Sequence, residues 1–222
     1  MKTTMNFMLV VSLAVVSFNS GAQTAGTWIG RIGLTRISPQ VSSGDMSAPS
    51  FPSTKADVSA DAQLSGGITY MYTDNVAIDL PVALPFKHKL NGAGALAGAG
   101  QLGQVKALPF TVFAQYRFNQ ATTAFRPYVG VGVTYAHFFG ESGSSALTAI
   151  TNPGGAGTQL SIQSKFAFTP QLGFTYALDE RWTVDGSFNK TYLKTRTNFS
   201  TGQTLDVTLN PNTYSLGLGM KF

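Results

Sequence analysis

The sequence predicts an all-β protein, an eight-stranded antiparallel transmembrane β-barrel with four long extracellular loops and short periplasmic turns. Apolar residues alternate with small or polar ones in segment after segment, as strands with a single lipid-facing surface require. Only 11% of the 222 residues are charged, well below the level of roughly 25% that is typical of soluble domains. Long and short connections follow one another in turn, which is typical of small outer-membrane barrels.

The alternating segments define eight strands and the connections between them. The strands are expected at residues 27–37, 64–72, 76–87, 108–118, 126–139, 166–178, 182–192 and 214–222. The stretches expected to form long loops are rich in small, polar and glycine residues, and they are 38–61, 88–106, 140–164 and 196–204.

The last strand shows the pattern most simply. Phe222 and every second residue before it back to Tyr214 are apolar, whereas the residues between them are small or polar. We expect this strand to pair with the first one, because an open strand edge cannot remain in lipid. Phe222 also resembles the signal that the outer-membrane assembly machinery recognises.

Composition excludes several other classes of protein. No stretch of the body is as long as the 18 apolar residues that indicate a helical membrane span. The net charge is +5, but the basic residues are scattered, which argues against nucleic acid as a partner. With no cysteines, disulfides and thiolate metal sites are excluded. A soluble β-sandwich fits the composition but does not explain the regular alternation of connection lengths.

Residues 1–22 are interpreted as a signal peptide. Lys2 precedes an apolar core from Phe7 to Phe18, and Ser20-Gly21-Ala22 supplies small residues for cleavage. A transmembrane anchor would need a longer apolar run. We therefore expect a barrel of residues 23–222 in the outer membrane of a Gram-negative cell, with both termini periplasmic.

Several motifs resemble the OmpW family of outer-membrane barrels, which includes AlkL-type proteins. They are Leu64–Lys89 (LSGGITYMYTDNVAIDLPVALPFKHK), Phe125–Tyr135 (FRPYVGVGVTY), Phe138-Phe139, Gln171–Tyr176 and Leu216–Phe222. The resemblance implies an eight-stranded barrel whose narrow, rather apolar lumen carries small hydrophobic molecules across or into the outer membrane.

The inward positions predict what fills the lumen. Charged residues there should pair or be hydrated, because the interior of an eight-stranded barrel is barely wider than its side chains. A salt-bridged plug toward the periplasm is favoured over a conducting polar pore. The expected inward charges are Arg31, Asp79, Lys87, Arg117, Asp185 and Lys221, and the expected apolar lining of the ligand path is Met71, Phe113, Leu193 and Phe138.

Two prolines in the third strand indicate a weak seam. Pro81 and Pro85 are four residues apart, so both face the same neighbouring strand and both remove a hydrogen-bond donor from it. We expect a lateral opening there, through which an apolar ligand leaves the lumen for the membrane. The alternative is a bulge through which nothing passes.

Motifs for enzymatic chemistry are weak. Gly98–Gly103 matches G-x-G-x-x-G, but it lies in a loop between antiparallel strands without the helix that a nucleotide site needs. His88 and His137 have no evident serine and carboxylate partners, and two histidines are too few for a closed metal site. We expect no enzyme activity, no cofactor and no metal.

The expected function is therefore passive uptake of small hydrophobic molecules. The expected partners are outer-membrane lipid and lipopolysaccharide, the assembly machinery and small hydrophobic solutes. Two alternatives remain: a structural or interaction protein with a receptor surface at the loops, and, ranked last, a lipid-modifying barrel enzyme.

Overall fold

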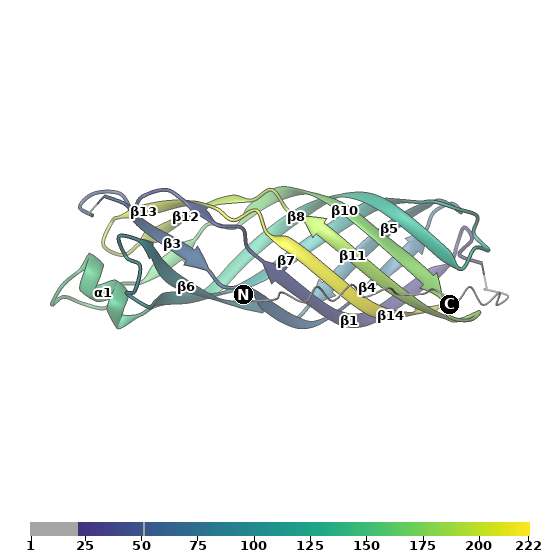
Figure 1. Ribbon diagram of the computed structural model, residues 1–222, viewed down its shortest axis with the longest axis horizontal. Coiled ribbons are helices and arrows are strands. Elements are labelled where there is room, and N and C mark those ends of the chain that lie inside the picture. Colours follow the sequence, from purple (N-terminus) through teal and green to yellow (C-terminus); the bar gives the residue numbers. More distant parts are fainter. Residues whose placement is uncertain (1–21, 51) are drawn as a thin grey trace, which may run out of the picture.

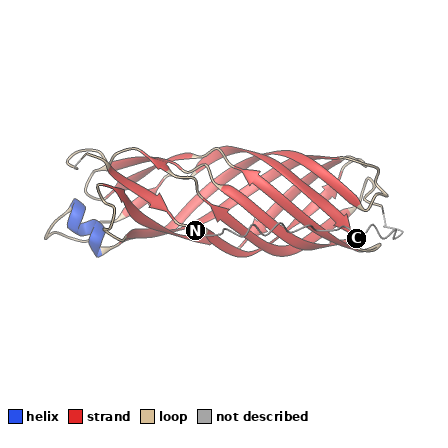
Figure 2. Cartoon of the chain, viewed as in Figure 1, coloured by secondary structure: helices blue, strands red, loops and turns tan. Residues whose placement is uncertain are grey.

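The chain folds into a closed antiparallel β-barrel (Figures 1 and 2). The computed structural model describes residues 22–50 and 52–222, so nearly all of the predicted signal peptide lies outside the described residues. Eight strands form the wall, with β5 and β6 as two parts of one of them. They are β1 (Trp28–Ser38), β4 (Asp61–Met71), β5 (Val76–Ala83) with β6 (Phe86–Gly94), β7 (Gln101–Arg117), β8 (Phe125–Gly143), β10 (Lys165–Ala177), β11 (Trp182–Lys190) and β14 (Asn212–Lys221).

The first and last strands close the barrel, as the terminal alternation predicts. The β1–β14 ladder runs without a register shift from Ile29 opposite Lys221 to Ser38 opposite Asn212. Trp28 and Phe222 extend it, because their N–H groups donate to each other's carbonyl oxygens at 3.0 and 2.9 Å. We call this ladder the closing seam. The barrel end that carries Phe222 is the turn end, and the end that carries the short helix is the loop end (Figure 1).

The outer wall carries a band of exposed apolar side chains. Ile32 and Leu34 on β1, Val82 on β5 and Phe110 on β7 all point away from the lumen. A monomeric protein in water rarely exposes so large a continuous apolar surface. Lipid removes that cost, and such a band is typical of membrane barrels.

The loop end contains more regular structure than the sequence predicts. The strands β6, β7 and β8 continue far beyond the apolar band, so that only residues 95–100 separate β6 from β7. The remaining elements are β2 (Ser42–Ser43), β3 (Thr54–Val58), α1 (Ser145–Thr151), β9 (Leu160–Ile162), β12 (Lys194–Phe199) and β13 (Thr204–Thr208). β3 joins the main sheet beside β6, while β2, β13, β12 and β9 form a small second sheet.

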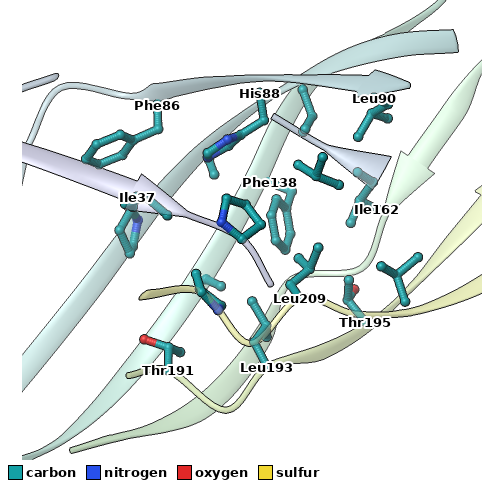
Figure 3. Close-up of a pocket in the computed structure, with 18 of the residues that line it drawn as sticks. Ile37, Phe86, His88, Leu90, Phe138, Ile162, Thr191, Leu193, Thr195 and Leu209 are labelled. Atoms are coloured by element: carbon teal, nitrogen blue, oxygen red, sulfur yellow. The ribbon is translucent and has the colours of Figure 1, made fainter. Parts of the chain in front are cut away.

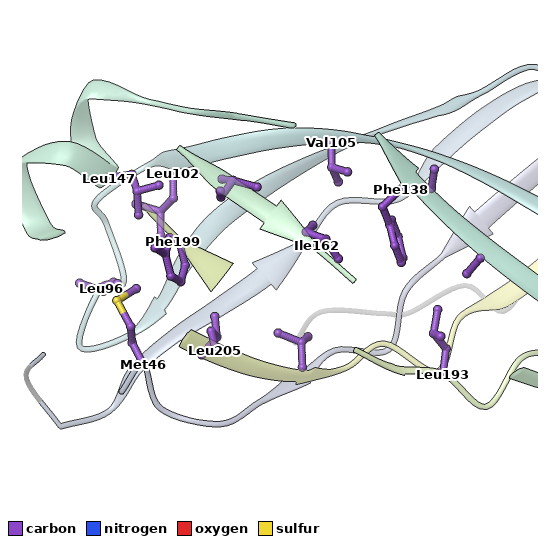
Figure 4. Close-up of a cluster of buried hydrophobic side chains, with 14 of the residues drawn as sticks. Met46, Leu96, Leu102, Val105, Phe138, Leu147, Ile162, Leu193, Phe199 and Leu205 are labelled. Carbon is purple, nitrogen blue, oxygen red and sulfur yellow. The ribbon is translucent and has the colours of Figure 1, made fainter. Parts of the chain in front are cut away.

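A buried apolar cluster explains why these segments are ordered. Leu147 of α1 packs with Leu96, Met46, Phe199 and Leu205, which come from distant parts of the sequence (Figure 4). The Ser144 hydroxyl caps α1 by accepting a hydrogen bond from the Leu147 N–H at 3.2 Å. The apolar interior of the barrel thus continues to the loop end.

The structure corrects the predicted orientation of two side chains after the prolines. Outward residues alternate regularly from Val76 to Leu84, but the side chain of Phe86 is fully buried and that of Lys87 is exposed. The chain changes phase between β5 and β6 at Pro85, so the prediction of Lys87 as an inward charge is wrong. Phe86 and His88 point inward instead.

Candidate functional site: a lumen cavity and an interrupted seam

The half of the lumen toward the turn end holds a buried ion-pair network. The Arg31 guanidinium lies 2.7 Å from an Asp79 carboxylate oxygen and 3.8 Å from Asp185. It also donates to the Thr69 hydroxyl at 2.9 Å, which in turn donates to Asp79 at 2.6 Å. Arg31 therefore joins inward residues of β1, β4, β5 and β11 across the lumen.

A second buried guanidinium extends the network. Arg117 donates to the side chains of Gln23, Gln115 and Thr175 at 3.1, 2.9 and 2.8 Å, and its Cζ lies 4.9 Å from the centre of the Tyr128 ring. The hydroxyl groups of Tyr128 and Thr175 both donate to Asp185. Gly173 allows this arrangement, since a β-carbon there would overlap the Tyr128 ring.

Arg31 therefore forms ion pairs with both aspartates, whereas Arg117 is held by hydrogen bonds to uncharged side chains. These contacts offset the cost of burying charged groups. Lys221 is also buried at the turn end, and its ammonium group lies 3.5 Å from the Asp179 carbonyl oxygen. We call this set of side chains the polar plug.

The other half of the lumen is an apolar cavity of about 160 Å³. Phe138, Leu193, Ile162 and Leu209 are among the side chains that surround it (Figure 3). Phe113 lies at the end of the cavity that faces the polar plug, and the lining continues up to Leu147 of α1. The lumen thus changes from ionic to apolar along its length.

His88 is the imidazole in the cavity wall. Its Nδ1 lies 2.7 Å from the carbonyl oxygen of Ser59. The backbone between β3 and β4 therefore fixes the orientation of the ring.

The wall beside the cavity has an interrupted ladder. On β5 the pairing with β7 runs from Val76 opposite Tyr116 to Asp79 opposite Phe113, and it resumes only at Phe86 opposite Ala107. Residues 80–85 and 108–112 form no ladder pairs with each other in the described structure. We call this stretch the interrupted seam.

Three prolines account for the interruption. The Asn75 carbonyl accepts the Arg117 N–H, so odd-numbered residues of β5 and β7 direct their backbone groups at this seam. Pro81, Pro85 and Pro109 are all odd-numbered, so each lacks the N–H that would have bridged the two strands. Pro109 was not identified from the sequence, although its position in the fourth predicted strand carries the same signal.

The cavity reaches both sides of the interrupted seam. Pro81, Ala83 and Pro109 border it, and so does Val82, whose side chain is 63% exposed on the outer wall. An apolar space inside the barrel and the apolar outer surface therefore meet where the two strands are not hydrogen-bonded.

The structure brings together most of the residues singled out in the sequence. Phe113, Phe138 and Leu193 line the cavity, and Arg31, Asp79, Arg117 and Asp185 form the polar plug. Met71 is buried but lies outside the cavity lining, because its backbone pairs with Gly26 and Thr27 at the turn end. The prediction that Met71 lines the ligand path is therefore not supported.

The described residues offer little for catalysis or metal binding. His137 Nδ1 lies 3.3 Å from the Ser164 hydroxyl, but the imidazole is stacked between Tyr135 and Phe139, and no carboxylate hydrogen-bonds to it in the described part of the chain. No group of three or more potential metal ligands occurs among these residues.

The G-x-G-x-x-G motif is placed in a turn and the start of a strand. Gly98 and Gly100 have positive φ angles in the turn before β7. No described helix is long and apolar enough to cross a membrane.

The exposed apolar band, the closed ladder and the internal plug together define a small membrane β-barrel. A family model for the OmpW family matches residues 24–222, and the chain belongs to this family of outer-membrane proteins. It is 31% identical to outer membrane protein W of Vibrio cholerae over 96% of this chain and 97% of that protein. It is 26% identical to outer membrane protein AlkL of Ectopseudomonas oleovorans over 98% and 93%.

A solved structure is similar to nearly the whole chain. The outer membrane protein OprG from Pseudomonas aeruginosa superposes with a TM-score of 0.81 at 30% identity, covering 93% of this chain and 99% of that one. The chain is therefore an outer-membrane barrel, as its alternation predicts.

Proposed function

We propose that this barrel is a channel for the passive uptake of small hydrophobic molecules. They enter the apolar cavity from the loop end and leave sideways through the interrupted seam into the membrane. The single observation that carries this proposal is that one continuous apolar cavity is bordered by Pro81, Ala83 and Pro109, on both sides of the unpaired stretch.

The polar plug favours a lateral route over a route along the axis. An apolar solute moving toward the turn end would have to separate Arg31 from Asp79 and Asp185 without offering a hydrogen bond in return. Removing one partner from a buried ion pair costs about 3–5 kcal/mol. The interrupted seam has no ladder hydrogen bonds to break, so widening it costs mainly side-chain contacts.

The experiment is an uptake comparison in cells with and without the protein, across alkanes, fatty acids and small ions. We expect faster uptake of the apolar solutes and no change for the ions. Equal rates for alkanes in both strains would contradict the proposal, and increased passage of ions would indicate a polar pore.

Lysines at the loop-end edge of the apolar band support lipopolysaccharide as a partner. Lys87 of β6 is directly opposite Lys106 of β7, and Lys89 is exposed nearby. None of the three has an ion-pair partner among the described residues. Like charges opposite each other destabilise a sheet, and the phosphate groups of lipopolysaccharide would relieve this repulsion. We propose that the lysines contact those phosphates.

A further inference from the structure

The boundary between the cavity and the polar plug is a ring of hydroxyl groups. Thr134 lies 2.9 Å from Thr111 and 2.7 Å from Thr169 in oxygen-to-oxygen distance, and Thr169 donates to Thr191 at 3.1 Å. On the opposite side, Thr35 lies 2.8 Å from the hydroxyls of both Ser65 and Ser215. The two chains of hydrogen bonds leave two breaks. One lies at β5, between Ser65 and Thr111, and the other lies between Thr191 and Ser215.

Asn189 occupies the second break, and it is not fully hydrogen-bonded. Its side chain is 9% exposed and borders the cavity, and its Oδ1 has no hydrogen-bond partner in the part of the chain that is described. Buried polar atoms are nearly always paired. Five buried side-chain atoms of the described residues lack a partner, and the Asn189 oxygen is the one that borders the cavity. A donor group on a molecule in the cavity can therefore pair with it.

Thr191 lies beside Asn189 with a proton to offer. Its hydroxyl accepts from Thr169, so its own hydrogen remains free for another acceptor. Thr191 follows directly on the end of β11, and its side chain, like that of Asn189, is buried and borders the cavity. Residues two apart in an extended chain are about 6.7 Å apart. A hydroxyl group of a bound molecule, placed between Asn189 and Thr191, would lie near both side chains. It could donate its hydrogen to the Asn189 oxygen and accept the hydrogen of the Thr191 hydroxyl.

The chemistry that fits both groups is a neutral hydroxyl on an apolar chain. The surrounding cavity wall is formed by side chains such as Leu193, Leu209 and Phe138 (Figure 3). An ionised carboxylate or ammonium group would have no countercharge at Asn189 and would be disfavoured. An alkane would fill the apolar space but would leave the Asn189 oxygen unpaired.

We propose that Asn189 and Thr191 bind the hydroxyl group of apolar alcohols, so that the cavity accepts a primary alcohol more readily than a cavity with an apolar side chain at position 189 would. The inference rests on the proposed function, because it assumes that the cavity holds small apolar solutes. It names a substrate class and a polar subsite within that cavity.

The test is displacement of an apolar fluorescent dye from the purified barrel by 1-octanol and by octane. The preference for 1-octanol is measured as the ratio of the octane to the 1-octanol concentration that displaces half of the dye. Because desolvation of the hydroxyl is the same in both proteins, we expect this ratio to be about five- to tenfold higher in the wild type than in Asn189→Leu, which corresponds to one neutral hydrogen bond. Octane should still displace the dye from Asn189→Leu. Folding of each variant is checked by the heat-dependent shift in its gel mobility.

Thr197→Val is the matched control. Thr197 also borders the cavity, but on β12 and away from the ring, so the preference should persist in this variant. The same ratio in the wild type and in Asn189→Leu would overturn the inference and would indicate that water satisfies Asn189. If neither solute displaces the dye and octane uptake does not depend on the protein, the proposed function itself fails.

Discussion

The closing seam and the interrupted seam are built from the same kind of strand, but they differ in continuity. The closing seam pairs every residue from Ile29 to Ser38 and is extended by Phe222. The interrupted seam loses its ladder between Asp79 and Phe86. A barrel in lipid has no water to satisfy a broken ladder, and the proposed function makes this interruption the point at which solutes leave.

Both limits of the interrupted seam are fixed by buried side chains. Asp79 forms the last pair before the gap, and Arg31 and Thr69 hold its carboxylate. Phe86 forms the first pair beyond the gap, and its ring is fully buried. With both ends anchored, the proposed exit is limited to the residues between them.

The largest expected effect on stability is at Asp79, which ends the regular ladder before the interrupted seam. Arg31→Met leaves Asp79 and Asp185 buried without their cation, which should lower the free energy of unfolding by about 3–5 kcal/mol. Urea unfolding in detergent would measure it. Arg36→Met, on the exposed side of β1, should change stability by less than about 0.5 kcal/mol. Equal stability of the two variants would show that the anchor is unimportant.

A proline should be tolerated at one seam and not at the other. Leu216 faces β1 with its backbone, so Leu216→Pro removes a donor from the closing seam and should cost about 3 kcal/mol. Ala83→Pro places a proline where no ladder bond exists to lose, and it should cost less than about 1 kcal/mol. Similar losses of folded protein for both variants would contradict the difference between the seams.

Removal of Phe222 tests the end of the closing seam. Its two backbone hydrogen bonds with Trp28 are lost, which should lower stability by about 1–2 kcal/mol. We expect less assembled barrel but unchanged uptake per folded molecule. Phe222→Ala keeps the backbone bonds and removes only the ring, so it separates an assembly signal from barrel closure. Normal membrane levels of the deletion would refute the prediction.

The smallest effect on stability is expected at Lys87 and Lys106, the opposed lysines at the loop-end limit of the interrupted seam. Lys106→Glu places opposite charges across the strands from Lys87, which should stabilise the seam by about 0.2–1 kcal/mol. Because a more stable seam opens less readily, we expect the uptake of an alkane by Lys106→Glu in vesicles of neutral lipid to fall by about twofold. Lys165→Glu, on β10, is the matched charge change away from this seam and should leave uptake unchanged.

The regular part of the fold could be predicted from the sequence because each wall strand has one lipid-facing side. Alternation defines such strands without any knowledge of their partners. The same reasoning identified Pro81 and Pro85 as a weak point of the wall. It did not predict the strands of the loop end, because β3, β12 and β13 lie outside the apolar band and are ordered by packing on the buried cluster.

The change of phase at Pro85 explains the wrong orientation of Lys87. A single shift exchanges every inward and outward position beyond it, and the run Phe86-Lys87-His88 fits either phase. The role of Asn189 was also not visible, because its significance depends on which neighbours are already hydrogen-bonded. Such information exists only once the strands of the barrel bring these hydroxyl groups together.

The most direct test of lateral release is to restore the interrupted seam. Pro81→Thr, Pro85→Thr and Pro109→Thr together return three donors at about 1 kcal/mol each, and hydrogen exchange at Ala83 and Thr111 would report whether the ladder forms. Pro170→Thr in β10 is the matched control. With the seam closed, we predict that uptake of an alkane into proteoliposomes falls at least about tenfold while the control is unchanged. Unchanged uptake through a demonstrably closed seam would contradict the lateral route.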